Sequence, residues 1–295
     1  MSALRYKKDR NDYLFDVVVW TILIGVMFIS IWPMYTIFIQ SISDGNEVMQ
    51  GNVVWFPKGI TFQTYVYVLR DPSILRALFN SIWYTSVRVL INLSFTAMCA
   101  YPLSRPKFSG KTFFTWMVTV TMLFSGGLIP LYLTVLRLGI MNTMWAVVLV
   151  PAINTWFMFI LRTFFQQIPE ELHESATIDG ANDLYIFVKI VIPLSTPILA
   201  TLLLFYAVSR WNAFLHPFMF LNEKAKYPLQ IFLRNVVKFG TSSERNLIGA
   251  SGDFLVAERT LRYATIMVTM FPILLIYPFV QKHVVKGIMV GSLKG

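Results

Sequence analysis

Carboxylates are scarce in this chain, and its longest apolar stretches contain none. Of 295 residues, 15 are Asp or Glu and 25 are Lys or Arg, while 56% are hydrophobic. Soluble globular domains carry charge on roughly a quarter of their residues, so the 14% found here disfavours a water-soluble enzyme. Cysteine is nearly absent as well. The single Cys99 excludes an internal disulfide bond and a thiolate metal cluster.

Six long stretches lack charge or contain a single arginine. Each is near or above the ~20 apolar residues that a helix needs to cross ~30 Å of hydrocarbon. A helix is expected because the alternation of a membrane β-strand is absent and an open strand would leave backbone groups unpaired in lipid. We therefore predict an all-α integral membrane protein with six transmembrane helices, at 17–43, 77–104, 112–136, 138–166, 194–222 and 263–285.

The basic residues predict how these helices are oriented. If the N-terminal tail 1–16 is inside, twelve Lys and Arg fall on the cytoplasmic side, crowded into short segments that include the C-terminal tail 286–295. Eleven others are mostly spread over two long loops outside, 44–76 and 223–262. The positive-inside rule then favours an N-in/C-in arrangement. This distribution also explains the net charge of +10 without nucleic acid as a partner.

Motifs for catalysis and nucleotide binding are incomplete. His173-Glu174 begins like the zinc-protease H-E-x-x-H, but position 177 is Thr. Ser109-Gly110-Lys111-Thr112 resembles the end of a phosphate-binding loop, but the glycine needed at 105 is an arginine. If ATP drives transport, another chain must hydrolyse it. The lack of membrane-embedded acids disfavours an ion-coupled secondary transporter, an alternative that stays open because backbone carbonyls bind Na⁺.

The segment 168–193 is the only short loop that is both acidic and helix-like. Pro169 suits a first helical turn, and Glu170 and Glu171 place negative charge at the positive end of the helix dipole. Asp179-Gly180 ends that helix, since glycine adopts the left-handed conformation of many C-caps. A second helical stretch is expected from 182 to about 191, where Pro193 leads into the next span.

A short helix, a sharp turn and a second helix form a shape that fits a partner's groove. Leu172, Ala176 and Ile178 can pack into such a groove, while Glu174 and Asp179 can meet basic groups at its rim. The alternative is an amphipathic loop lying on lipid. Acidic residues facing anionic lipid disfavour that alternative.

This loop resembles the EAA loop of ABC importer permeases, E-A-A-x3-G-x9-I-x-L-P. Glu174-Ser175-Ala176, Gly180 and Ile190-Val191-Ile192-Pro193 match it, with Ser175 for Ala and Ile192 for Leu as the two departures. Further motifs are similar to permeases of carbohydrate-uptake importers such as the maltose permease. They are Trp211-Asn212-Ala213-Phe214 with Pro217, Tyr227-Pro228-Leu229, and the ending Gly287-x3-Gly291-x2-Lys294-Gly295. The sequence from Phe124 to Leu221 resembles the LplC-type branch.

The resemblance implies a MetI/MalG-like permease core over about 77–285, in a non-catalytic subunit of a sugar importer in a bacterial or archaeal cell membrane. ATP and Mg would be bound by a partner ATPase dimer, and the other partners would be a second permease, an extracytoplasmic solute-binding protein and an oligosaccharide. An ABC permease for peptides or amino acids remains the alternative. The ATPase-coupling residues it implies are Glu170, Glu171, Glu174, Ser175, Ala176, Asp179, Gly180, Pro193, Gly291, Lys294 and Gly295.

Two arginines interrupt the apolar spans. Arg88 and Arg210 each cost about 2.5–3.5 kcal/mol at mid-bilayer, so they should face a cavity, a partner or an interface. We interpret them as substrate-pathway candidates with Tyr206, Trp211 and Asn212, and pairing between helices is the alternative.

Three other features remain open. Gly126-Gly127 with Pro130 marks a bend or break, which either lines a pathway or is a packing kink. An intramembrane hydrolase would need a nucleophile and a base at depth, and His216 is the only histidine in a span. The loop 223–262 is too long for a plain connection, and the resemblance implies that it meets the binding protein.

Overall fold

The structure, a computed structural model, describes residues 10–239 and 260–275. Helices joined by loops account for this part of the chain, and no strand occurs in it. Two compact units are present, Met1–Arg70 with Val236–Val268 and Asp71–Asn235 with Thr269–Gly295. The prediction of an all-α protein is confirmed.

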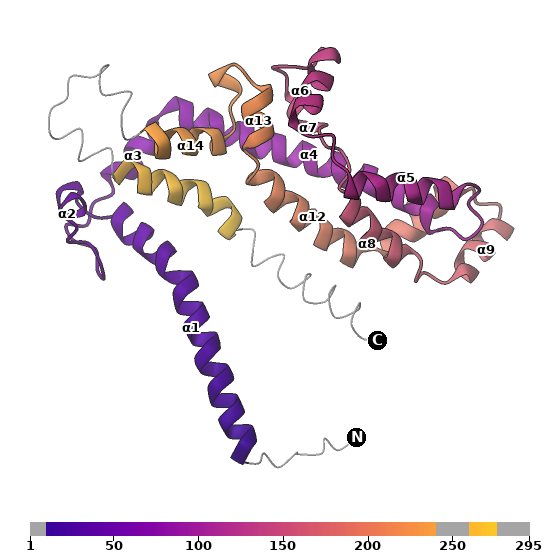
Figure 1. Ribbon diagram of the computed structural model, residues 1–295, viewed down its shortest axis with the longest axis horizontal. Coiled ribbons are helices and arrows are strands. Elements are labelled where there is room, and N and C mark those ends of the chain that lie inside the picture. The colour runs from indigo at the N-terminus through magenta and orange to yellow at the C-terminus, as the bar shows by residue number, and fades with distance from the viewer. Residues whose placement is uncertain (1–9, 240–259, 276–295) are drawn as a thin grey trace. The chain divides into compact units, whose positions relative to one another are not determined.

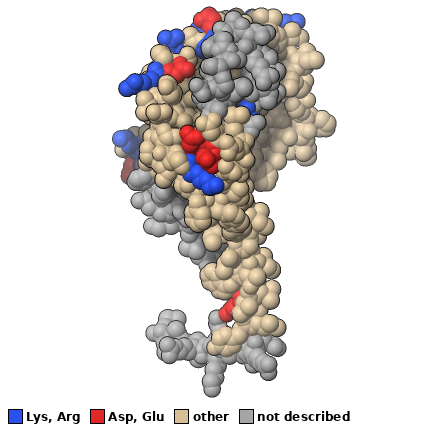
Figure 2. All heavy atoms as spheres, turned by 90° about the vertical axis from the view of Figure 1, so that its left-hand side faces the viewer, with Lys and Arg blue, Asp and Glu red and all other residues tan. Residues whose placement is uncertain are grey.

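The first unit contains α1 (Arg10–Ser41), α2 (Gly45–Met49) and α3 (Gln63–Arg70) (Figure 1). Within α1, the apolar stretch Asp12–Ser41 is 30 residues long, and none of its most hydrophobic window is buried. Figure 2 shows α1 as a column with charged side chains only near its beginning. A helix that is apolar on all sides is stable where lipid or another chain surrounds it.

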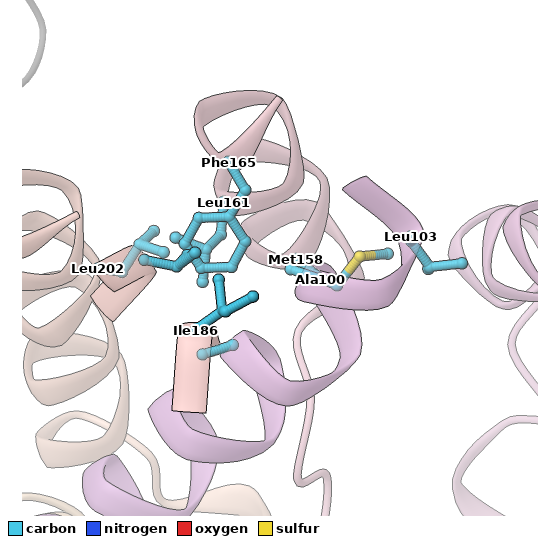
Figure 3. Packing of buried hydrophobic residues seen from close by; sticks show 9 residues of the cluster. Ala100, Leu103, Met158, Leu161, Phe165, Ile186 and Leu202 are labelled. Atoms are coloured by element: carbon cyan, nitrogen blue, oxygen red, sulfur yellow. The ribbon is translucent and has the colours of Figure 1, made fainter. Parts of the chain in front are cut away.

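The second unit is organised around α4 (Pro72–Ser104), against which α8 (Thr155–Phe165) and α12 (Thr196–Trp211) pack. Asp71 begins α4 by accepting a hydrogen bond from the Ser73 N–H at 2.8 Å. Figure 3 shows the apolar core between these helices. Its buried members are Ala97, Ala100, Leu103, Met158, Leu161, Phe165, Ile186, Val191 and Leu202.

The stretch 112–136 forms two helices, α5 (Lys111–Leu123) and α6 (Leu128–Arg137), which are bent by 116°. Gly127, with φ +84°, lies in the break and Pro130 follows it. A positive φ suits glycine, and Pro130 cannot donate a backbone hydrogen bond to the preceding turn. The bend predicted at these residues is confirmed.

The stretch 138–166 does not form the single helix expected from its hydropathy. It contains α7 (Met144–Val148) and α8, separated by the non-helical residues 149–154. Pro151 lies in this gap, where a proline removes a backbone donor and disfavours the helical conformation of the residue before it. Similarly, the helix expected over 194–222 ends at Trp211.

The remaining helices of residues 10–239 and 260–275 are short or lie at unit boundaries. They are α9 (Glu170–Ile178), α10 (Asp183–Ile186), the π-helix η1 (Phe187–Val191), α11 (Ile192–Leu194), α13 (Leu215–Phe220), the 3₁₀-helix η2 (Lys224–Lys226), α14 (Leu229–Phe239) and the helix Thr260–Leu275. By length and composition, two helices of the described part can cross a membrane, or up to four if each bent pair is one span.

Candidate functional site

The predicted helix, turn and helix are present at one end of the second unit. Glu170 and Glu171 occupy the first turn of α9. Gly180, with φ +83°, ends this helix, and its N–H donates to the Thr177 carbonyl at 3.0 Å. Asn182 then begins α10 by accepting a hydrogen bond from the Tyr185 N–H at 2.8 Å. The local sequence signals therefore predicted this shape correctly.

Apolar side chains project from this turn into open space. Ile178 is 86% exposed and Leu184 is 69% exposed. The acidic residues Glu174 and Asp179 are exposed as well. Ala176 differs, because it is half-buried against the core of its own chain. The turn thus offers an apolar tip with an acidic border, which is a surface suited to a partner protein.

Two ion pairs connect α9 to the loop that follows α4. Arg105 Nη2 lies 2.8 Å from Glu170 Oε1, and both side chains are partly buried. Lys107 Nζ lies 3.8 Å from Glu174 Oε1 in a mostly exposed pair, which contributes little. Of the two pairs, Arg105–Glu170 therefore contributes more to holding α9 beside the end of α4. No local signal in the sequence pairs residues 65 positions apart.

A groove of about 970 Å³ runs between the end of α4, α9 and α10. His173 lines it and is 4% exposed, with neither ring nitrogen hydrogen-bonded within the described part of the chain. Its ring stacks on Tyr101 with centroids 6.2 Å apart. Burial, followed by the nearby Arg105 guanidinium, lowers the pKa of His173 below its usual value of 6.5. The ring is therefore neutral at neutral pH.

Pro193 lies where the second helical stretch changes direction. Residues 187–191 form the π-helix η1, and the helices on either side of Ser195 are bent by 81°. A proline inside a helix clashes with the carbonyl four residues earlier, and a wider π turn relieves that clash. Pro193 is thus positioned to fix the angle between α10 and α12.

A buried polar network lies in the middle of the same unit. Arg88 is 1% exposed and donates from Nη2 to the Val150 carbonyl. Asn92, which is fully buried, donates from Nδ2 to the carbonyls of Pro151 at 3.2 Å and Ala152 at 2.6 Å. These side chains satisfy the carbonyls of the gap between α7 and α8. Non-helical backbone is tolerated at membrane depth when it is buried and paired in this way.

The candidate Arg210 joins this network from α12. Its Nε donates to Asn92 Oδ1 at 2.9 Å, and its guanidinium lies 5.8 Å from the Tyr206 ring centroid. Tyr206 is fully buried, and its hydroxyl accepts from the Asn154 N–H at 3.1 Å and hydrogen-bonds with Thr96 at 2.7 Å. Arg210 therefore lies beside Tyr206 and lines one small cavity with Arg88.

The other two pathway candidates lie differently. Trp211 is buried and donates from Nε1 to the Thr269 carbonyl at 3.2 Å, whereas Asn212 is exposed at the end of α12. Sequence reasoning missed Asn92 and Thr96. A signal was available, because Asn92 and Thr96 follow Arg88 at intervals of four and therefore share its helix face.

A further polar cluster of the unit is centred on Asn142, whose φ is 57°. Asn142 Oδ1 accepts from the Asn222 N–H at 3.1 Å, and its Nδ2 donates to Glu223. Lys226 Nζ lies 3.0 Å from Glu223 Oε1. Hydrogen bonds from Lys226 and Asn142 lower the pKa of Glu223. The coupling candidates Gly291, Lys294 and Gly295 lie outside the described residues.

Comparison with known proteins identifies relatives over nearly the whole chain. The family model described as "Binding-protein-dependent transport system inner membrane component" matches residues 74–290. Protein LplC of Bacillus subtilis (strain 168) is 41% identical, over 96% of this chain and 95% of its own length. The polygalacturonan/rhamnogalacturonan transport system permease protein YtcP of the same organism is 38% identical, over 97% and 100%.

A solved structure is also similar. It is a bacterial ABC transporter involved in the import of the acidic polysaccharide alginate, and the matching chain is 33% identical with a TM-score of 0.87. The match covers 94% of this chain and 99% of the other.

Proposed function

Because the chain belongs to the family of inner membrane components of binding-protein-dependent transport systems, we propose that its α9–α10 turn couples a separate ATPase to solute import. The chain is an ABC importer permease of the sugar and oligosaccharide class with a MetI-like fold. Relatives named for polygalacturonan/rhamnogalacturonan, for arabinooligosaccharides and for alginate support an oligosaccharide as the cargo.

The surface of the α9–α10 turn carries this proposal. Ile178 is 86% exposed at its tip, and Glu171, Glu174 and Asp179 border it. An exposed isoleucine in water is unfavourable, and a groove on a partner would remove it from solvent. The acidic border then meets basic residues at the rim of that groove. In the proposed N-in/C-in arrangement, this turn faces the cytoplasm, where an ATPase dimer binds ATP and Mg.

The contacts of α9 indicate how its displacement would reach the membrane helices. The Arg105–Glu170 pair connects α9 to the end of α4, and η1 and α11 connect α10 to α12. We propose that closure of the ATPase dimer moves this turn and that α4 and α12 follow, in alternating access with a second permease. A solute-binding protein delivers the oligosaccharide from the other side.

Co-purification tests the partner assignment. We expect the chain, purified from its native membrane, to bring down an ATPase and a second permease. Ile178→Asp should reduce the recovered ATPase but not the permease, because it places a charge in the proposed apolar contact. Leu138→Asp is the matched control, since Leu138 is 64% exposed on another segment. Equal ATPase recovery with both variants would contradict the docking role of α9.

A further inference from the structure

Arg88 and Arg210 bring two positive charges into the second unit, and within the described part of the chain no carboxylate lies beside them. Arg88 lies midway along α4, and both arginines line one small cavity. Ser81, Tyr84, Thr85 and Trp211 are among the other lining residues, and no acid is. Neither arginine takes part in an ion pair within residues 10–239 and 260–275. Buried charges are ordinarily paired, so this arrangement lacks an anion.

The donors of the two side chains are only partly used. Arg88 Nε is buried and has no hydrogen-bond partner among the described residues, while Nη2 donates to Val150. Arg210 donates through Nε to Asn92, and this bond fixes the plane of its guanidinium. No described residue accepts from the terminal nitrogens of Arg210, and its side chain is partly exposed. These free donors form the fork that binds a carboxylate through two hydrogen bonds.

We propose that Arg210 binds the carboxylate of an acidic oligosaccharide during transport, with Arg88 adding positive charge and Asn92 orienting the guanidinium. This assignment rests on the proposed function, since it names the substrate class of the same permease. A carboxylate that leaves water needs a positive partner, whereas a neutral sugar hydroxyl does not. In this structure the cavity measures about 10 Å³, the space of about one water molecule. The sugar therefore enters only when alternating access separates the walls of the cavity.

The test uses the complete transporter in proteoliposomes with its binding protein. Import of oligogalacturonides is compared with import of the same oligosaccharides after methyl esterification, which removes the charge and keeps the backbone. Arg210→Gln should lower import of the charged form by roughly ten- to hundredfold more than import of the ester, as expected for loss of a charge-assisted hydrogen bond. Arg210→Lys keeps the charge but not the fork, so it should restore part of this preference.

Arg137→Gln is the control, because it removes an exposed arginine that does not line the cavity. Its ratio of charged to esterified import should equal that of the unsubstituted transporter. Equal losses of both substrates in Arg210→Gln would overturn the proposal and indicate that Arg210 pairs with a partner subunit. If the Arg210→Gln transporter does not assemble, the Arg210→Lys transporter serves as the test. A ratio of charged to esterified import equal to that of the unsubstituted transporter would then refute the assignment.

A different experimental result would refute the proposed function. A transporter that imports neutral oligosaccharides but never the charged ones refutes the acidic substrate and leaves the sugar permease intact. A transporter that imports no saccharide of either kind refutes both.

Discussion

Gly180→Val should uncouple ATP hydrolysis from import while leaving the membrane fold in place. Gly180 has φ +83°, and a Cβ built on it meets nothing within 4 Å, so the substitution acts through backbone strain alone. The left-handed conformation costs an L-residue about 1–2 kcal/mol, and a β-branched residue is an outlier there. That cost is smaller than the ~5–15 kcal/mol stability of a typical domain, so the packing of α4, α8 and α12 should persist.

The strain acts on the turn itself. Two backbone hydrogen bonds close it, from Gly180 to Thr177 and from Ala181 to Ala176, at 3.0 and 2.9 Å. A penalty of about 1.4 kcal/mol lowers the population of this turn relative to open alternatives by about tenfold. The angle between α9 and α10 is then lost, and motion of the docked ATPase no longer reaches α12. The expected result is continued ATP hydrolysis with little sugar imported per ATP.

The assay is import and ATPase activity of the same proteoliposomes, with Gly180→Asn as the matched control. Asparagine adopts the left-handed conformation more readily than other non-glycine residues, so it should retain most coupling. Detergent gel filtration checks that both variants assemble equally. A normal ratio of import to hydrolysis in Gly180→Val, or equal loss in both variants, would refute the reasoning.

Four other substitutions test three further predictions. The pKa of His173 is lowered in the folded chain, so the unfolded chain binds a proton first as pH falls below 6.5. Thermal stability should therefore decline below this pH, and His173→Phe should make the decline smaller. Tyr206→Phe leaves the Asn154 N–H unpaired and should cost about 1–3 kcal/mol in unfolding free energy, measured by thermal melting. The double variant Arg105→Gln with Glu170→Gln should lose less import activity than the sum of the losses, as free energies, in the two single variants. A loss equal to that sum would contradict their pairing.

The sequence predicted those features that local chemistry determines. Acidic residues at the start of α9 and a glycine at its end lie within one short segment, so the shape of the turn followed from them. The bend after α5 was likewise visible in Gly127 and Pro130. In each case the residues that cause the conformation are neighbours in the chain, and no tertiary contact is needed to specify it.

The missed features depend on contacts between distant residues. Hydropathy shows that 138–166 is apolar but not that its backbone is interrupted at 149–154. The interruption is stable because Arg88 and Asn92, about 60 residues earlier, donate hydrogen bonds to its carbonyls. Likewise, Glu170 looked free to meet a partner until the structure placed Arg105 beside it.

Both candidate sites contact α4, but this shared helix does not by itself couple them. Arg105 follows the end of α4, and Arg88 lies 17 positions earlier, which is about 25 Å along a helix at 1.5 Å per residue. Coupling over such a distance requires an element with two arrangements, and a straight helix alone does not supply one. The bend at Ser195 can, because α12 carries Arg210 on one side of it and α10 lies on the other. Under the proposed coupling to an ATPase, motion of the α9–α10 turn would therefore shift Arg210 relative to Arg88 and open the cavity between them.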